Sequence, residues 1–126
     1  MKISTGAERI TAERKRQILS EGWTAEHDDE HTDSSLALAA ICYAAPERMY
    51  VKRHSLNGVV FTDPWPVSWT HEWDKRFRYG ERRGNSGNIL PHPDSYSRDE
   101  RLDLLTKAGA LIAAEIDRLL REENHE

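Results

Sequence analysis

The C-terminal part of the chain carries the pattern that most restricts the fold. Ser97 and Glu100 have the spacing of a helix capping box. After them, apolar residues recur every three or four positions for about seven turns, as one face of an α-helix requires: Leu102, Leu105, Gly109, Ile112, Ile116 and Leu119. The centre of this segment, KAGALIAAEI, is rich in alanine and glycine, which lets another helix approach closely. The sequence predicts a long helix here, packed on a second helix or on a copy of itself.

Two shorter helices are predicted upstream. The first runs from about Ala7 to Glu21, because Thr5 and Glu8 form another capping box and Gly22 suits the position just past a helix end. The second covers about residues 34–45, in the run SSLALAAICYAAP, which has almost no polar face and therefore belongs at the centre of the fold.

The segment between the second and third helices, about residues 46–96, follows a different pattern. MYVKRHS and VVFTD flank a turn with Asn57-Gly58, which is typical of a β-hairpin, although an irregular excursion is the alternative. A tryptophan- and arginine-rich stretch follows, in which we expect Trp65 and Trp69, held by neighbouring prolines, to cover the core. The sequence thus predicts a mainly α fold, a three-helix single domain over residues 1–126 with this segment as an insertion.

Composition predicts a thin core and a partner. Of the 126 residues, 37% are hydrophobic and 32% charged, so we expect a homodimer or higher homo-oligomer that completes the burial of apolar surface. The expected interface is the Ala/Gly face of the C-terminal helix or the tryptophan-rich insertion. The net charge of −4, with acidic ends and a basic middle, argues against binding to long nucleic acids.

The cellular setting is predicted from what the sequence lacks. Cys42 is the one cysteine, which suits a reducing compartment. No run of about 18 apolar residues that could span a bilayer is present, and the N-terminus has no apolar signal segment. We therefore expect a cytoplasmic protein without a membrane partner.

The segment EHDDEH has three interpretations. His27, Asp28, Asp29 and His31 could bind a divalent metal, with Glu13 or Glu115 completing the shell. They could instead form an internal polar network, or a solvated loop that leads into the second helix. The network is favoured by Arg14, which occupies the apolar face of the first helix and needs a carboxylate, because an unpaired buried cation is costly. We expect Asp28 or Asp29 to supply it, and no resident cofactor.

The run WDKRFRYGERR combines cations with aromatic rings. Arginines pair with phosphates and aromatic rings stack on bases, so this composition suits an anionic, nucleotide-type ligand. The alternative is a solvated loop anchored by its aromatic side chains. The candidate ligand-binding residues are Trp73, Arg76, Phe77, Arg78, Tyr79, Arg82 and Arg83.

Four segments resemble a family of small phage and prophage proteins without a settled activity. They are AERKRQILSEGW, EHDDEH, ALAAICYA and KAGALIAAEIDRL. The chain is only faintly similar to MazG-type all-α pyrophosphohydrolases, whose metal carboxylates it does not match, since Glu115 and Asp117 are two positions apart. The resemblance implies a phage accessory protein acting in the cytoplasm of a bacterial host cell.

From these observations we expect a non-enzymatic, counter-defence binding protein that captures an anionic nucleotide-derived ligand. Two alternatives remain. The chain could inhibit a host defence protein by binding it directly, or it could be a metal-dependent, MazG-like nucleotide pyrophosphohydrolase, with a divalent metal as its cofactor.

Overall fold

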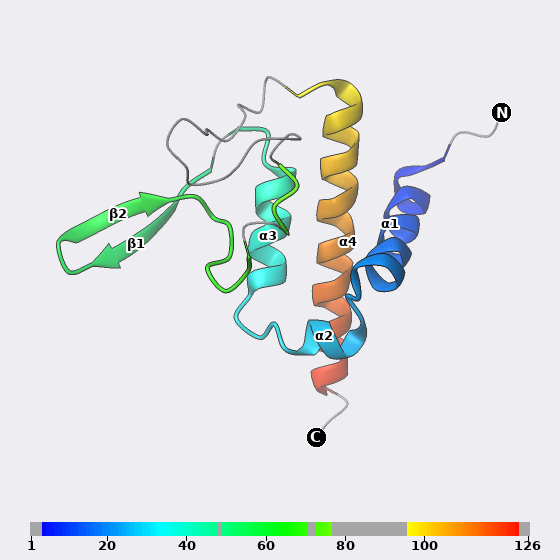
Figure 1. Cartoon of the computed structure of the whole chain (residues 1–126), viewed down its shortest axis with the longest axis horizontal. Coiled ribbons are helices and arrows are strands. Elements are labelled where there is room, and N and C mark those ends of the chain that lie inside the picture. The colour runs from blue at the N-terminus through cyan, green and yellow to red at the C-terminus, as the bar shows by residue number, and fades with distance from the viewer. Residues whose placement is uncertain (1–3, 48, 71–72, 77–95, 124–126) are drawn as a thin grey trace.

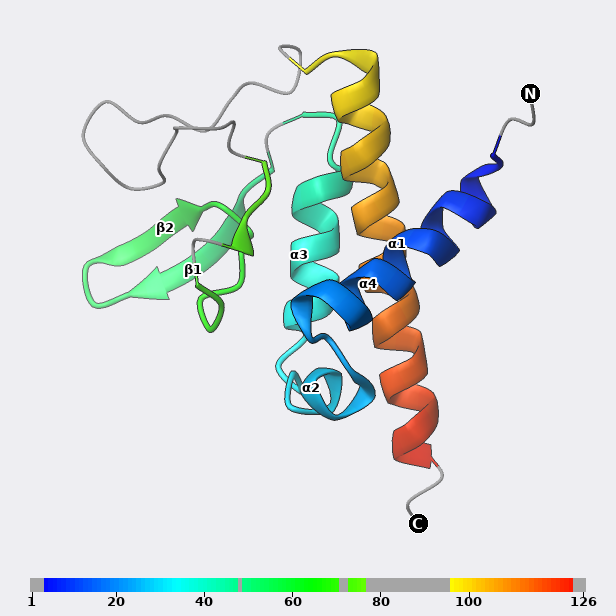
Figure 2. The ribbon, with the colours of Figure 1, turned by 45° about the vertical axis from the view of Figure 1, so that its right-hand side comes forward.

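A long C-terminal helix organises the structure. The computed structural model describes residues 4–47, 49–70, 73–76 and 96–123. Within this part of the chain the elements are α1 (Gly6–Glu21), α2 (Ala25–Asp29), α3 (Ser35–Ala44), β1 (Val51–Ser55), β2 (Gly58–Thr62) and α4 (Arg98–Glu123). α3 packs along one side of α4, α1 crosses another side, and α2 lies beside the C-terminal half of α4 (Figures 1 and 2).

The mainly α class is confirmed, but the prediction of three helices is wrong. The additional helix, α2, lies in the segment EHDDEH, for which no helix is predicted from the sequence. It forms because Thr24 caps it, its hydroxyl accepting a hydrogen bond from the backbone N–H of His27. α2 is fixed to α4 by Arg121, which donates to Asp29 and to the backbone carbonyl of Ala25.

The predicted helix ends agree closely with the structure. Thr5 and Glu8 form the capping box of α1, and Gly22 ends that helix in the left-handed conformation, with φ of 73°. The C-terminal end of α3 is completed from a distance. Arg101 of α4 donates to the carbonyl oxygens of Tyr43 and Ala45, both at 3.2 Å, and to that of Ala44. A side chain of one helix therefore satisfies the last carbonyls of another.

The face of α4 that packs inward differs from the predicted one. Ala108, Ala110 and Ala114 are buried against the rest of the chain. On the predicted face, Leu102 is half-buried, whereas Leu105, Ile112, Ile116 and Leu119 are exposed. α1 crosses at Gly109, where a Cβ would lie 2.5 Å from Cδ1 of Ile10. Small side chains form the internal contacts because they allow α1 and α3 to come close. The Ala/Gly face is therefore not available as a dimer interface.

The predicted hairpin is present and projects from the helices (Figure 1). β1 and β2 are antiparallel, and Ser55 pairs with Gly58. The turn is therefore Leu56-Asn57, one residue before the expected position, and Gly58 begins β2 with φ of 120°. Val59, Val60 and Phe61 of β2 are exposed.

Candidate functional site: an aromatic cavity with a charged rim

Three tryptophans pack edge to face, Trp23 from the segment after α1 and both Trp69 and Trp73 from the segment after the hairpin. The ring centroids of Trp23 and Trp69 are 4.9 Å apart, those of Trp23 and Trp73 5.5 Å, and those of Trp69 and Trp73 5.3 Å. Trp65 continues the cluster against Trp69 at 5.5 Å. Trp65 and Trp69 are buried, which confirms that they cover the core. Such edge-to-face pairs are the preferred geometry of aromatic rings.

Tyr43 of α3 holds the segment after the hairpin in place. Its hydroxyl donates to the carbonyl of Trp73 at 2.9 Å and accepts from the backbone N–H of Lys75 at 3.0 Å. Burial raises the pKa of the Tyr43 phenol, so it stays protonated and keeps its donor. This contact positions both Trp73 and Lys75 beside α1 and α4.

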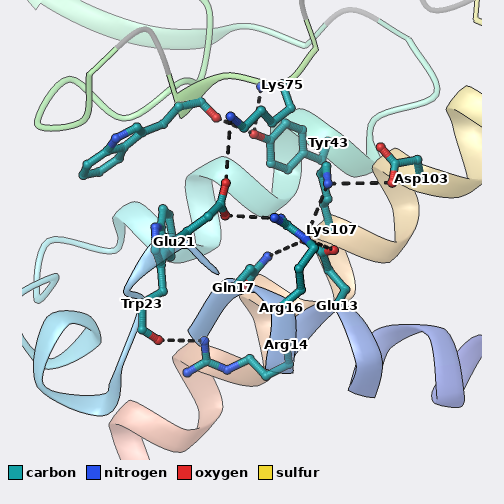
Figure 3. Close-up of polar contacts among 11 residues, drawn as sticks. Glu13, Arg14, Arg16, Gln17, Glu21, Trp23, Tyr43, Lys75, Asp103 and Lys107 are labelled. Carbon is teal, nitrogen blue, oxygen red and sulfur yellow. Dashed lines mark hydrogen bonds and ion pairs between the residues drawn. The ribbon is translucent and has the colours of Figure 1, made fainter. Parts of the chain in front are cut away.

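A cavity of about 450 Å³ opens between these side chains and the end of α1. Figure 3 shows the polar contacts among the residues of its rim, such as Glu13, Arg16 and Glu21. The apolar walls of the cavity are mainly aromatic, and its rim is charged. The aromatic wall residues are Trp23, Tyr43, Trp69 and Trp73, with Leu111 of α4. The remaining lining residues are Glu13, Arg16, Gln17, Glu21, His27, Lys75 and Lys107. The volume lies within the range of about 300–1,000 Å³ that is usual for small-molecule sites.

Cations outnumber carboxylates among the described lining residues. Glu13 accepts from Arg16 at 2.8 and 2.7 Å and from Lys107 at 3.5 Å. Glu21 pairs with Arg16 at 3.2 Å and with Lys75 at 3.8 Å. Burial alone would raise the pKa of Glu13, but the hydrogen bond from Arg16 and the charge of Lys107 outweigh it, so the pKa is lowered. Both carboxylates are shared by three cations, so the lining residues carry one more cation than carboxylate, although Lys107 also pairs at 3.7 Å with Asp103, which lies outside the lining.

Two buried polar atoms of the lining residues have no hydrogen-bond partner within the described part of the chain. They are Oε1 of Gln17 and Nδ1 of His27. Gln17 uses its amide nitrogen to donate to Glu13 at 3.2 Å. Both atoms are fully buried, and Nδ1 of His27 lies 3.6 Å from Oδ1 of Asp28, so neither atom is presented to a ligand in the cavity.

The pairing expected for Arg14 is present. Its guanidinium contacts Asp28, whose side chain is 0% exposed against 13% for that of Arg14. Arg14 also donates to the carbonyl of Trp23 at 3.2 Å. The pair thereby joins α1, the start of the aromatic cluster and α2. It is a tie between elements, and it lies beside the cavity without lining it.

The other polar residues of EHDDEH are divided between different neighbours. Asp29 accepts a hydrogen bond from Arg121 at 2.7 Å. Nδ1 of His31 accepts from Nε1 of Trp69 at 3.3 Å, and burial together with the charge of His27 lowers the pKa of His31. Among the described residues, no three His, Cys, Asp or Glu side chains are grouped as metal ligands. The structure thus does not assemble the set His27, Asp28, Asp29 and His31.

The other two carboxylates that the metal hypothesis invokes are also paired. Glu115 accepts a hydrogen bond from Nε of Arg118 at 2.6 Å, and Glu13 accepts one from Arg16. Neither is positioned with the pair His27 and His31 as a shared ligand set.

Arg76 has a structural role in place of the expected ligand contact. It is buried, and its guanidinium donates to Asp74 at 3.0 and 2.8 Å and to Asp63 at 3.0 and 2.7 Å. These carboxylates raise the pKa of Arg76 in spite of its burial, which opposes the charge. Of the other candidates in that run, Trp73 lines the cavity. Phe77, Arg78, Tyr79, Arg82 and Arg83 lie outside the described residues.

Several lining residues were not predicted from the sequence. Glu13 and Gln17 are four positions apart and both are buried on the inner face of α1. Two polar residues on the face where apolar ones are expected would have indicated a polar cavity below that helix. Lys107 and Tyr43 carry no comparable signal.

Comparisons with known proteins add no relative. No family model, curated protein or solved structure matches the chain. None of the described helices is long and apolar enough to cross a membrane.

Proposed function

We propose that the chain is a binding protein for a small anionic ligand with a planar ring, such as a nucleotide-derived signal. The observation that supports this most directly is the cavity itself, in which tryptophan rings stand beside a rim where cations outnumber carboxylates. Stacking of a base on an aromatic side chain contributes about 1–3 kcal/mol. The ammonium and guanidinium groups of Lys75, Lys107 and Arg16 would meet the phosphates. We therefore propose the cavity, in place of the arginine run, as the ligand site, and Trp73 belongs to both.

The cellular role remains the one that the resemblance implies. We propose a phage counter-defence protein in the cytoplasm of a bacterial host, which removes a signal by binding it without chemical change. The carboxylates of the cavity support binding over hydrolysis, because both are already engaged by cations of the chain. Direct inhibition of a host protein and metal-dependent hydrolysis are the competing outcomes.

Isothermal titration calorimetry against cyclic nucleotides and ADP-ribose derivatives tests the proposal. We expect Lys75→Met and Trp73→Leu each to weaken binding at least tenfold, since one removes a rim cation and the other a stacking wall. Lys15→Met is the matched control, because Lys15 is an exposed cation of α1 outside the cavity lining.

Three results would contradict the proposal. The first is the absence of binding by any of these compounds, and the second is unchanged affinity in both cavity variants. The third is product formation, followed by chromatography, when Mg²⁺ or Mn²⁺ is added, which would support the hydrolase. A host protein that co-purifies with a chain that binds no nucleotide would favour the direct inhibitor.

A further inference from the structure

A second hollow adjoins the aromatic cavity along α1. Its volume is about 500 Å³, and it is lined by the first half of α1 and the first turns of α4. Glu13 and Arg16 line both spaces. The lining residues of α1, from Arg9 to Glu21, have the spacing of one helix face, so the two spaces together extend for about 18 Å along the helix.

The chemistry of the second hollow differs from that of the aromatic cavity. None of its described lining residues is aromatic, so it offers no ring on which a base could stack. Its polar lining residues beyond the shared pair are Arg9, Arg98, Asp99, Asp103 and Thr106. With Glu13 and Arg16 included, cations and carboxylates are equal in number, whereas cations are in excess around the aromatic cavity. This lining therefore suits a polar ligand group without net charge.

The boundary between the two spaces carries two cations. Arg16 donates to Glu13 at 2.8 and 2.7 Å. Lys107 contacts Glu13 at 3.5 Å and Asp103 at 3.7 Å, and it thereby connects a carboxylate of each helix (Figure 3). Because Arg16 and Lys107 both compensate Glu13, a phosphate at this boundary would meet N–H donors on either side of that carboxylate.

We propose that the ligand is a nucleoside diphosphate sugar, an inference that rests on the function proposed above. The base stacks in the aromatic cavity, the diphosphate lies at the boundary beside Arg16 and Lys107, and the terminal sugar occupies the second hollow. Sugar hydroxyls donate to carboxylates such as Asp99 and accept from guanidinium groups such as that of Arg9, so a neutral sugar uses both kinds of charged side chain.

Two other ligand classes use the surface less well. A mononucleotide reaches only the aromatic cavity and its boundary, and it leaves the second hollow to water. A dinucleotide places its second base where no described lining residue is aromatic, and it gains no stacking there.

Calorimetry with matched pairs of ligands tests this inference. The pairs are ADP with ADP-ribose and UDP with UDP-glucose, whose members differ by the terminal sugar. The free terminal phosphate of ADP or UDP carries more negative charge than the esterified one, so charge alone would favour the member without the sugar. We expect the sugar-bearing member of at least one pair to bind about three- to tenfold more tightly, which is the gain from about one net hydrogen bond.

A double variant locates the origin of this preference. Arg9→Met with Ala12→Leu removes one hydrogen-bond donor of the second hollow and narrows it, and both positions line this hollow alone. We expect the variant to bind the two members of the pair with equal affinity. Lys15→Met with Ala7→Leu is the matched control and should keep the preference, since both residues are exposed on α1 and line neither space.

The possible failures are distinguishable. Equal affinity of the natural chain for both members of each pair overturns this inference alone, because the proposed binding of a nucleotide would still stand. A preference that persists in the Arg9→Met, Ala12→Leu variant also overturns it. The absence of binding by all four compounds overturns the inference together with the proposed function.

Discussion

Asp28→Asn is expected to destabilise the protein strongly by removing the charge partner of Arg14. Asp28 is fully buried and Arg14 nearly so, and breaking a buried ion pair costs about 3–5 kcal/mol. The lower end applies here, because asparagine keeps the volume and one acceptor, and because Arg14 retains its bond to the carbonyl of Trp23. For a chain of this length, a loss of about 3 kcal/mol corresponds to a fall in Tm of about 9–15 °C.

The assay is thermal denaturation followed by circular dichroism, with EDTA and with added Mg²⁺ or Mn²⁺. Asp29→Asn is the matched control, since it is the same change at the next residue, whose ion pair with Arg121 is partly exposed and contributes about 0–1 kcal/mol. We expect the large loss for Asp28→Asn in both conditions. An Asp28→Asn chain that melts like the parent in EDTA would refute the reasoning, as would equal losses in the two variants.

Two further predictions concern stability. The pKa of His31 is lowered, so below about pH 6.5 the unfolded chain takes up a proton before the folded chain does. The free energy of unfolding should therefore fall as the pH decreases, by at most about 1.4 kcal/mol per pH unit. Urea titrations at several pH values should show a weaker dependence of this free energy on pH for His31→Gln, and an unchanged dependence for the exposed His54→Gln. Gly109→Ala should lower Tm, because its Cβ would collide with Ile10. With Ile10→Ala already present, the same change should stabilise by about 1 kcal/mol, the helix preference of alanine, and equal effects in both backgrounds would contradict the crossing geometry.

The helix ends were predictable from sequence because their causes are local. The capping box of Thr5 and Glu8 and the glycine after α1 each depend on residues within one turn. The inward face of α4 was not predictable in the same way. The inward face combines Leu104 and Leu111 with alanines, and the opposite face carries Leu105, Ile112, Ile116 and Leu119, so the periodicity of apolar residues fits both faces. The face with alanines packs inward because α1 and α3 both approach α4 there.

The candidate site was predictable only in part. The pairing of Arg14 with Asp28 follows from a cation on an apolar helix face, which demands a nearby carboxylate. The cavity depends on contacts between distant positions, such as the hydrogen bonds of Tyr43 to Trp73 and Lys75, which span 30 and 32 residues. No pattern within one segment indicates such contacts. The composition of the arginine run predicted a ligand site there, yet the guanidinium of Arg76 donates to two carboxylates of its own chain.

The hydrogen bonds of Arg101 to the end of α3 determine which part of the chain can change in length. By holding residues 43–45 against the start of α4, they join the two ends of the excursion that contains the hairpin. The entropy of closing a loop whose ends are fixed grows only with the logarithm of its length, at about 0.6 kcal/mol for each doubling. Because β1 and β2 project from the helices, their length can vary at little cost to the helical body. The hairpin is thus the place where this chain can gain or lose residues while its helices stay the same.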